Sequence, residues 1–157
     1  NSEQGAAMSS VAVTEARPIP PFLWGVFGGA LGGLAFLPVM MLLQPTIWAE
    51  AVGLVLPALR GTAAEFLGWL IHVSLLALWG GLFAITFRPR EPGSILPAAL
   101  GWGFLLAWFT VMAVTLIHAS PLPLLGWVLE TLAHAAYGAV LAATLIYVSR
   151  PGAAQGA

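Results

Sequence analysis

Glu130 and His134 lie four residues apart in an apolar stretch that is long enough to cross a bilayer. This spacing places both side chains on one face of a helix. A charged side chain at the centre of a membrane helix costs roughly 2.5–3.5 kcal/mol on insertion scales, so a partner must offset that cost. His72 lies in a second apolar stretch. These three residues are therefore the candidates for a functional site.

Four kinds of chemistry are compatible with His72, Glu130 and His134. The simplest is a hydrogen bond between spans, because leaving a polar group unpaired in lipid costs more than the bond itself contributes. Two histidines and a carboxylate also form a recognised ligand set for transition metals. His72 and His134 could instead be axial ligands of haem b or of a (bacterio)chlorophyll. The fourth alternative is a proton or solute path through Glu130.

The sequence excludes several other classes of function. It contains no cysteine, which rules out disulfides and thiolate metal sites. Its net charge is −1, so it offers no basic surface for nucleic acid. We find no nucleophile–base pair, no phosphate-binding loop and no dinucleotide fingerprint. We therefore expect a protein that is not an enzyme.

The composition indicates a membrane protein. The 157 residues are 60% hydrophobic and 7% charged, with a mean hydropathy of +0.95, whereas soluble domains have about 25% charged residues. Four apolar stretches have about the 20 residues that a spanning helix needs, and they do not alternate as barrel strands do. We predict an all-α polytopic protein whose spans are residues 21–43, 66–87, 95–117 and 122–148.

The arginines predict the orientation of this membrane domain, residues 21–148. One side of the membrane receives most of them, namely Arg17, Arg88, Arg90 and Arg150, and the other side receives Arg60. The positive-inside rule then places both termini in the cytoplasm, with a disordered arm over residues 1–20 and a short tail over residues 149–157. The absence of lysine favours a GC-rich bacterial gene, and hence the bacterial inner membrane.

An internal repeat relates the two halves of the domain. Gly68-Trp69-x-x-His72 in the second span matches Gly126-Trp127-x-x-Glu130 in the fourth, and Gly29 aligns with Gly101 in the first and third. We predict two pseudo-repeated helical hairpins related by an axis along the membrane normal. His72 and Glu130 would then occupy equivalent positions within one buried polar cluster.

Small residues mark a close-packing face on the first span. Gly25, Gly29 and Gly33 recur every four residues, and such faces let helix backbones approach closely in lipid. Two interpretations remain open, namely packing inside the bundle and docking of a helix from another protein. The segment Ile47–Leu56, between the first two spans, is too short to cross and is expected to form an interfacial helix.

Motifs in two spans resemble those of a known family. Gly68-Trp69-x-x-His72 and His134-x-x-Tyr137-Gly138 are similar to patterns in small, uncharacterised four-span bacterial inner-membrane proteins. The resemblance covers about residues 20 to 148 and implies four helices with a shared role for the two histidines. It implies no activity.

We expect a non-catalytic accessory subunit of a larger energy-transducing complex, respiratory or photosynthetic. The expected partners are the lipid bilayer and other membrane subunits, and not nucleic acid. The alternatives are a protein that binds haem b or chlorophyll through His72 and His134, and a small transporter of protons or solutes that uses Glu130. No cofactor is established by the sequence.

Overall fold

The computed structural model describes residues 19–43, 47–87, 92–118 and 121–149. Within them the chain is all-α, with helices α1 (Pro21–Leu43), α2 (Ile47–Val55), α3 (Thr62–Thr86), α4 (Pro92–His118) and α5 (Leu124–Val148). Four of these, α1 and α3–α5, are long and apolar enough to cross a membrane. The predicted all-α, polytopic membrane fold is thus confirmed. The N-terminal arm to residue 18, the end of the tail and Arg17, Arg88, Arg90 and Arg150 lie outside the described residues.

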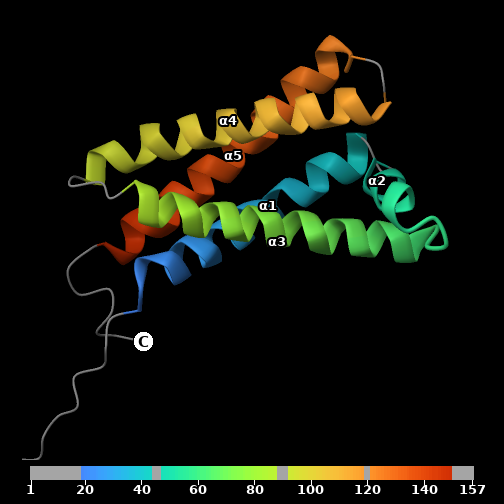
Figure 1. Ribbon diagram of the computed structural model, residues 1–157. Helices are drawn as coiled ribbons and strands as arrows, with labels where there is room; N and C mark the ends of the chain where they lie inside the picture. The colour runs from blue at the N-terminus through green and yellow to red at the C-terminus, as the bar shows by residue number, and fades with distance from the viewer. Residues whose placement is uncertain (1–18, 44–46, 88–91, 119–120, 150–157) are drawn as a thin grey trace, which may run out of the picture.

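The four long helices lie side by side, and α2 packs against α3 at one end of the bundle (Figure 1). We call this end the α2 end; α1 starts and α5 finishes at the opposite end. Helix α1 packs closely against both α3 and α5, and α5 packs against α4. Over their described lengths, α3 and α4 do not approach each other as closely. The site described below lies between these two helices.

Glycines set the crossing of α1 and α3. A Cβ atom at Gly29 would overlap the carbonyl oxygen of Leu76, and one at Gly80 would overlap the carbonyl oxygen of Gly25. Gly33 lies in the same contact, where its Cβ would be 3.3 Å from the Leu76 side chain. The glycine face of α1 is therefore packed inside the bundle. Of the two interpretations left open for this face, the structure supports packing inside the bundle, because α3 occupies it.

The crossing of α4 and α5 repeats this geometry. A Cβ atom at Gly103 would overlap the carbonyl oxygen of His134, and one at Gly138 would overlap that of Ala99. Each α3 residue thus corresponds to the α5 residue 58 positions later, as Leu76 does to His134. The predicted equivalence of His72 and Glu130 follows this same offset.

The register predicted for the first helix of each hairpin is wrong. Gly29 corresponds to Gly103, and not to Gly101, where an added Cβ would meet nothing within 4 Å. Identities between apolar residues recur by chance, whereas a helix crossing is fixed where a glycine meets a backbone carbonyl. The offset between α1 and α4 is therefore 74 residues.

The remaining two helix contacts break the symmetry of the repeat. Gly28 and Gly32 let α1 close onto α5, where their Cβ atoms would lie 3.0 Å from Thr144 and 2.7 Å from Tyr137. The counterpart of Gly28 in the second hairpin is Trp102. Its ring centroid lies 5.6–6.0 Å from those of Trp79 and Phe83 on α3 and of Phe87, which directly follows α3. Glycine thus closes one interface, and tryptophan holds the equivalent one apart.

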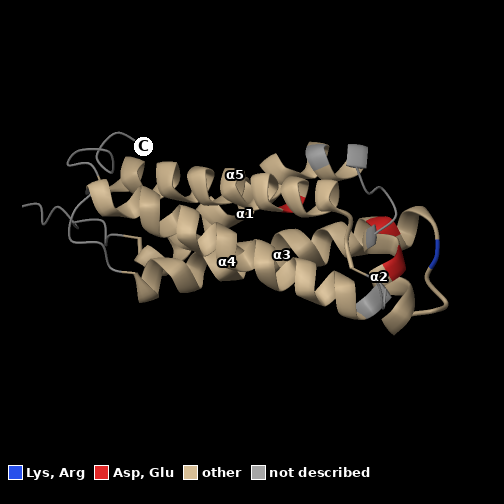
Figure 2. Cartoon of the chain, turned by 90° about the horizontal axis from the view of Figure 1, so that it is seen from above, with Lys and Arg blue, Asp and Glu red and all other residues tan. Residues whose placement is uncertain are grey.

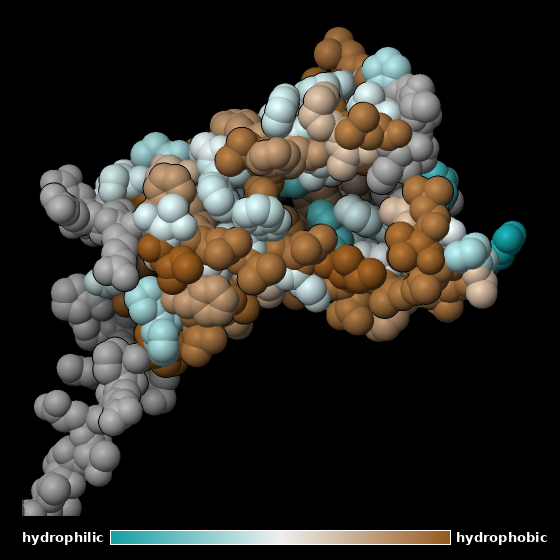
Figure 3. All heavy atoms as spheres, in the orientation of Figure 1, coloured by the Kyte–Doolittle hydropathy of each residue, from teal (hydrophilic) through white to brown (hydrophobic). Residues whose placement is uncertain are grey.

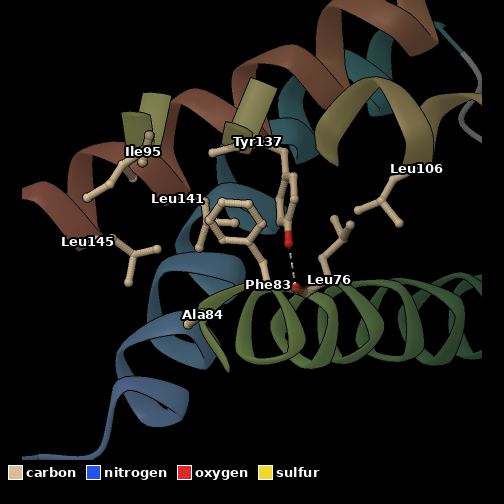
Figure 4. Close-up of a cluster of buried hydrophobic side chains, with 10 residues drawn as sticks. Leu76, Phe83, Ala84, Ile95, Leu106, Tyr137, Leu141 and Leu145 are labelled. Carbon is tan, nitrogen blue, oxygen red and sulfur yellow. Dashed lines mark hydrogen bonds between the residues drawn. The ribbon is translucent and has the colours of Figure 1, made fainter. Parts of the chain in front are cut away.

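Tyr137 joins three helices at the centre of the bundle (Figure 4). The side chain is fully buried, and its hydroxyl donates a hydrogen bond of 2.9 Å to the backbone carbonyl oxygen of Leu76 on α3. Its ring lies against Gly32 of α1, where a side chain would collide with it. The Tyr-Gly part of the sequence motif therefore has a packing role.

Replacing Tyr137 by phenylalanine should lower the free energy of unfolding by about 0.6–1 kcal/mol, which is the typical net worth of one such hydrogen bond. The loss is small because the ring, and so its packing, is kept. Denaturation in mixed detergent micelles measures it. The matched change Tyr147→Phe alters a tyrosine that is 62% exposed and should have no effect. Equal losses in both variants would contradict the role given to the Tyr137 hydroxyl.

Candidate functional site

The structure brings the three predicted site residues together inside the bundle. His72 lies on α3, and Glu130 and His134 lie on α5, with exposed fractions of 4%, 1% and 1%. Figure 2 shows acidic residues at the α2 end and one further acidic position within α5, which the sequence identifies as Glu130. All three side chains border one pocket. A carboxyl group and two imidazoles therefore share an interior site.

Both ring nitrogens of His134 have partners. Nδ1 lies 2.9 Å from the backbone carbonyl oxygen of Glu130, and Nε2 lies 3.4 Å from the hydroxyl oxygen of Thr110 on α4. Because a carbonyl oxygen can only accept, this pattern places the imidazole proton on Nδ1. Nε2 then accepts from the Thr110 hydroxyl. His134 is thus a positioned link between α5 and α4.

Glu130 and His72 are less well satisfied. Glu130 Oε2 lies 3.4 Å from His134 Nδ1, but that nitrogen is directed at the Glu130 carbonyl oxygen. Among the described residues, neither Glu130 Oε2 nor His72 Nε2 has a hydrogen-bond partner, and both atoms are buried. Each such atom costs about 1–3 kcal/mol of desolvation free energy. Two unpartnered polar atoms beside one pocket therefore call for a ligand or water.

Aromatic rings enclose the two histidines. The Trp48 ring of α2 lies 4.2 Å from the His72 ring between centroids, and the Phe36 ring of α1 lies 5.2 Å from both histidine rings. Gly68 lets Trp48 take this position, because a Cβ at Gly68 would lie 2.6 Å from the Trp48 Cβ. Our sequence reasoning missed Trp48 and Phe36. The glycine four residues before His72 was the available signal that a large neighbour packs there.

The pocket lies between α3 and α4 and has a volume of about 240 Å³. Its side walls are apolar, with Leu75 and Trp79 from α3 and Phe109 and Ala113 from α4. Trp48 of α2 borders it at the α2 end, and the polar site residues of α5 and α3 border it inside. Figure 3 shows a hollow on this face with hydrophilic atoms within it, bordered by residues of intermediate hydropathy and by hydrophobic ones. We call this feature the α3–α4 pocket.

The geometry bears differently on the two cofactor alternatives. In the part of the chain that the structure describes, no three His, Cys, Asp or Glu side chains are arranged to hold a metal ion. A metal site at His72, Glu130 and His134 thus gains no support. The pocket is also smaller than pockets for drug-sized ligands, which have volumes of about 300–1,000 Å³. In addition, His134 Nε2 already lies within hydrogen-bond distance of the Thr110 hydroxyl. A haem or chlorophyll macrocycle between His72 and His134 would require the helices to move apart.

Comparisons with known proteins add no functional assignment. No protein-family model, curated protein or solved structure matches the chain. The resemblance of its histidine motifs to those of four-span bacterial proteins therefore stays a prediction. The functional assignment rests on the pocket and on the polar groups beside it.

Proposed function

We propose that this chain is a non-catalytic membrane protein that binds one small, lipid-soluble molecule in the α3–α4 pocket. The observation that carries this proposal is the presence of unpartnered, buried polar atoms of His72 and Glu130 beside an apolar pocket. Ligand pockets commonly combine apolar walls with a few polar groups that fix orientation. We further propose that the chain acts as an accessory subunit of a larger energy-transducing complex in the bacterial inner membrane.

Four hydroxyl groups are bound to backbone carbonyls and not to a base, which supports a role without covalent catalysis at those positions; the Thr110 hydroxyl, 3.4 Å from His134 Nε2, is the exception. Ser74, Thr131, Thr144 and Ser149 each donate a hydrogen bond of 2.6–2.9 Å to the carbonyl oxygen four residues earlier in their own helix. A hydroxyl bound in this way is not activated by a base. Glu130 and His134 therefore have no serine or threonine nucleophile to activate among these four residues. The subunit role is carried over from the sequence, in which no catalytic motif accompanies the four spans.

Mild-detergent purification from native membranes tests both parts of the proposal. We expect an organic extract of the purified chain to contain an equimolar small molecule, detected by mass spectrometry, and other membrane subunits to co-migrate with the chain. Ala113→Phe fills the pocket and should abolish the bound molecule. Ala136→Phe adds the same ring at an exposed position of α5 outside the pocket and should retain it.

Each part can fail separately. An extract without any stoichiometric molecule would show that the binding role is wrong. A chain that runs alone as a monodisperse species would show that the subunit role is wrong. A Soret or Qy absorption band that disappears in His72→Ala would support the haem or chlorophyll alternative instead.

A further inference from the structure

Three buried polar atoms without a hydrogen-bond partner in the described chain belong to residues that border the α3–α4 pocket. They are Trp48 Nε1 on α2, His72 Nε2 on α3 and Glu130 Oε2 on α5. They come from three helices, and the residues that carry them border one pocket, which distinguishes them from isolated defects of packing. One ligand group placed among them could restore all three hydrogen bonds. The inference below rests on the binding function proposed above and concerns the chemistry of the ligand.

The hydrogen-bonding capacities of these atoms restrict that chemistry. Trp48 Nε1 can only donate, a Glu130 carboxylate oxygen can only accept, and His72 Nε2 does either according to its tautomer. A ligand ammonium would leave Trp48 without an acceptor. A ligand carboxylate would leave the Glu130 carboxylate without a donor. A hydroxyl group both donates and accepts, so it satisfies the whole set.

The shape of the pocket restricts the rest of the ligand. Its volume of about 240 Å³ suits one ring, and Trp48, Trp79 and Phe109 supply aromatic surfaces around it. Aromatic rings pack favourably at centroid distances of about 4.5–7 Å. The hollow in Figure 3 opens on the face of the bundle beside hydrophobic surface, so an apolar substituent can extend into the lipid. We propose that the ligand is a lipid-soluble, single-ring phenol or quinol whose hydroxyl binds between Trp48, His72 and Glu130.

A matched series of ligands tests the hydroxyl requirement. The purified chain in lipid nanodiscs is titrated with thymol, with thymol methyl ether and with phenethylammonium, and the shift in melting temperature reports binding. The ether keeps the ring of thymol but cannot donate a hydrogen bond. We expect thymol to bind about 10- to 100-fold more tightly than the ether, which corresponds to one hydrogen bond to a charged group. Phenethylammonium should not bind in the pocket.

A double-mutant cycle assigns this difference to Glu130. The amide oxygen of glutamine still accepts a hydrogen bond, so Glu130→Gln should weaken thymol binding by about 5- to 10-fold, the difference between a bond to a carboxylate and one to a neutral oxygen. Binding of the methyl ether should stay unchanged, because the ether makes no bond to the carboxylate. A merely structural effect would weaken both ligands equally. Glu65→Gln changes an acidic residue of α3 outside the pocket and should alter neither affinity. The comparison of ligands on the unmodified chain remains decisive if Glu130→Gln does not fold.

The outcomes separate this inference from the proposed function. If the ether or the ammonium binds as tightly as thymol, and Ala113→Phe abolishes that binding, the pocket binds ligands but the phenol assignment is wrong. If thymol binds Ala113→Phe as tightly as the unmodified chain, it binds elsewhere, and the assignment is again wrong. If none of the three ligands binds, the phenol assignment fails, and the extract from native membranes decides whether the binding function stands.

Discussion

Replacing Gly103 by alanine should lower the free energy of unfolding by about 1–3 kcal/mol, the usual cost of overpacking a tight contact. The new Cβ would overlap the carbonyl oxygen of His134, and a backbone atom cannot rotate away as a side chain can. Helix α4 must therefore move away from α5. Because His134 also links these helices through Thr110, the same change should weaken ligand binding in the α3–α4 pocket. Denaturation in mixed micelles and ligand titration measure the two effects.

Gly101 supplies the matched control on the same helix. A Cβ there meets nothing within 4 Å, so Gly101→Ala should be neutral or stabilising by up to about 1 kcal/mol through helix propensity. The pair also tests the register of the repeat, since the register predicted from sequence alone would exchange the two outcomes. A larger loss at Gly101 than at Gly103 would contradict the α4–α5 crossing described above.

Replacing Trp102 by alanine should cost up to about 3–5 kcal/mol, as large-to-small changes at packed tryptophans do. The indole contacts two aromatic rings of α3 and that of Phe87 directly after it, and holds α4 away from that helix. Without it, α4 should move toward α3 and narrow the α3–α4 pocket. Leu75 and Ala113 border the pocket on opposite helices, and the chain contains no cysteine. Oxidative cross-linking of Leu75→Cys with Ala113→Cys should therefore become faster when Trp102 is also replaced.

Trp108 is the control for this experiment. It lies on α4 with 52% of its surface exposed, and its ring packs edge-to-face against that of its neighbour Phe109. Trp108→Ala should leave the cross-linking rate and the stability nearly unchanged. A cross-linking rate that does not change on removal of Trp102 would show that this residue does not set the distance between α3 and α4.

The elements of the fold could be predicted from the sequence to a large extent. Hydropathy determines spans because every backbone polar group in lipid must pair within its own helix. The spans expected at residues 66–87 and 95–117 correspond to helices Thr62–Thr86 and Pro92–His118. Both helices begin before the most apolar residues of their spans. The repeat also predicted that His72 and Glu130 lie in one site, since equivalent positions on parallel helices lie at similar depths in the membrane.

The lateral packing could not be predicted in the same way. All four spans are apolar around most of their circumference, so hydropathy does not say which helix Gly25 and Gly29 face, nor that Trp102 replaces a glycine at the equivalent contact. The place of Trp48 against His72 depends on how α2 folds back, which the sequence did not specify. The pocket arises from these shape differences. It was therefore absent from the sequence-based hypotheses, although its polar residues were among them.

The two hairpins resemble the two subunits of a dimer joined in one chain. Such a dimer has two equivalent grooves, here between α1 and α5 and between α4 and α3. In the first hairpin, Gly28 and Gly32 of α1 let α5 pack closely against them, which closes one groove. In the second hairpin the equivalent positions on α4 are Trp102 and Leu106. A symmetric assembly would offer two openings on opposite sides. In the described part of this chain α1 closes onto α5, whereas the α3–α4 pocket lies at the equivalent place, so a small number of substitutions determines on which side of the bundle the pocket lies. Exchanging those residues between the hairpins would move the opening to the other side.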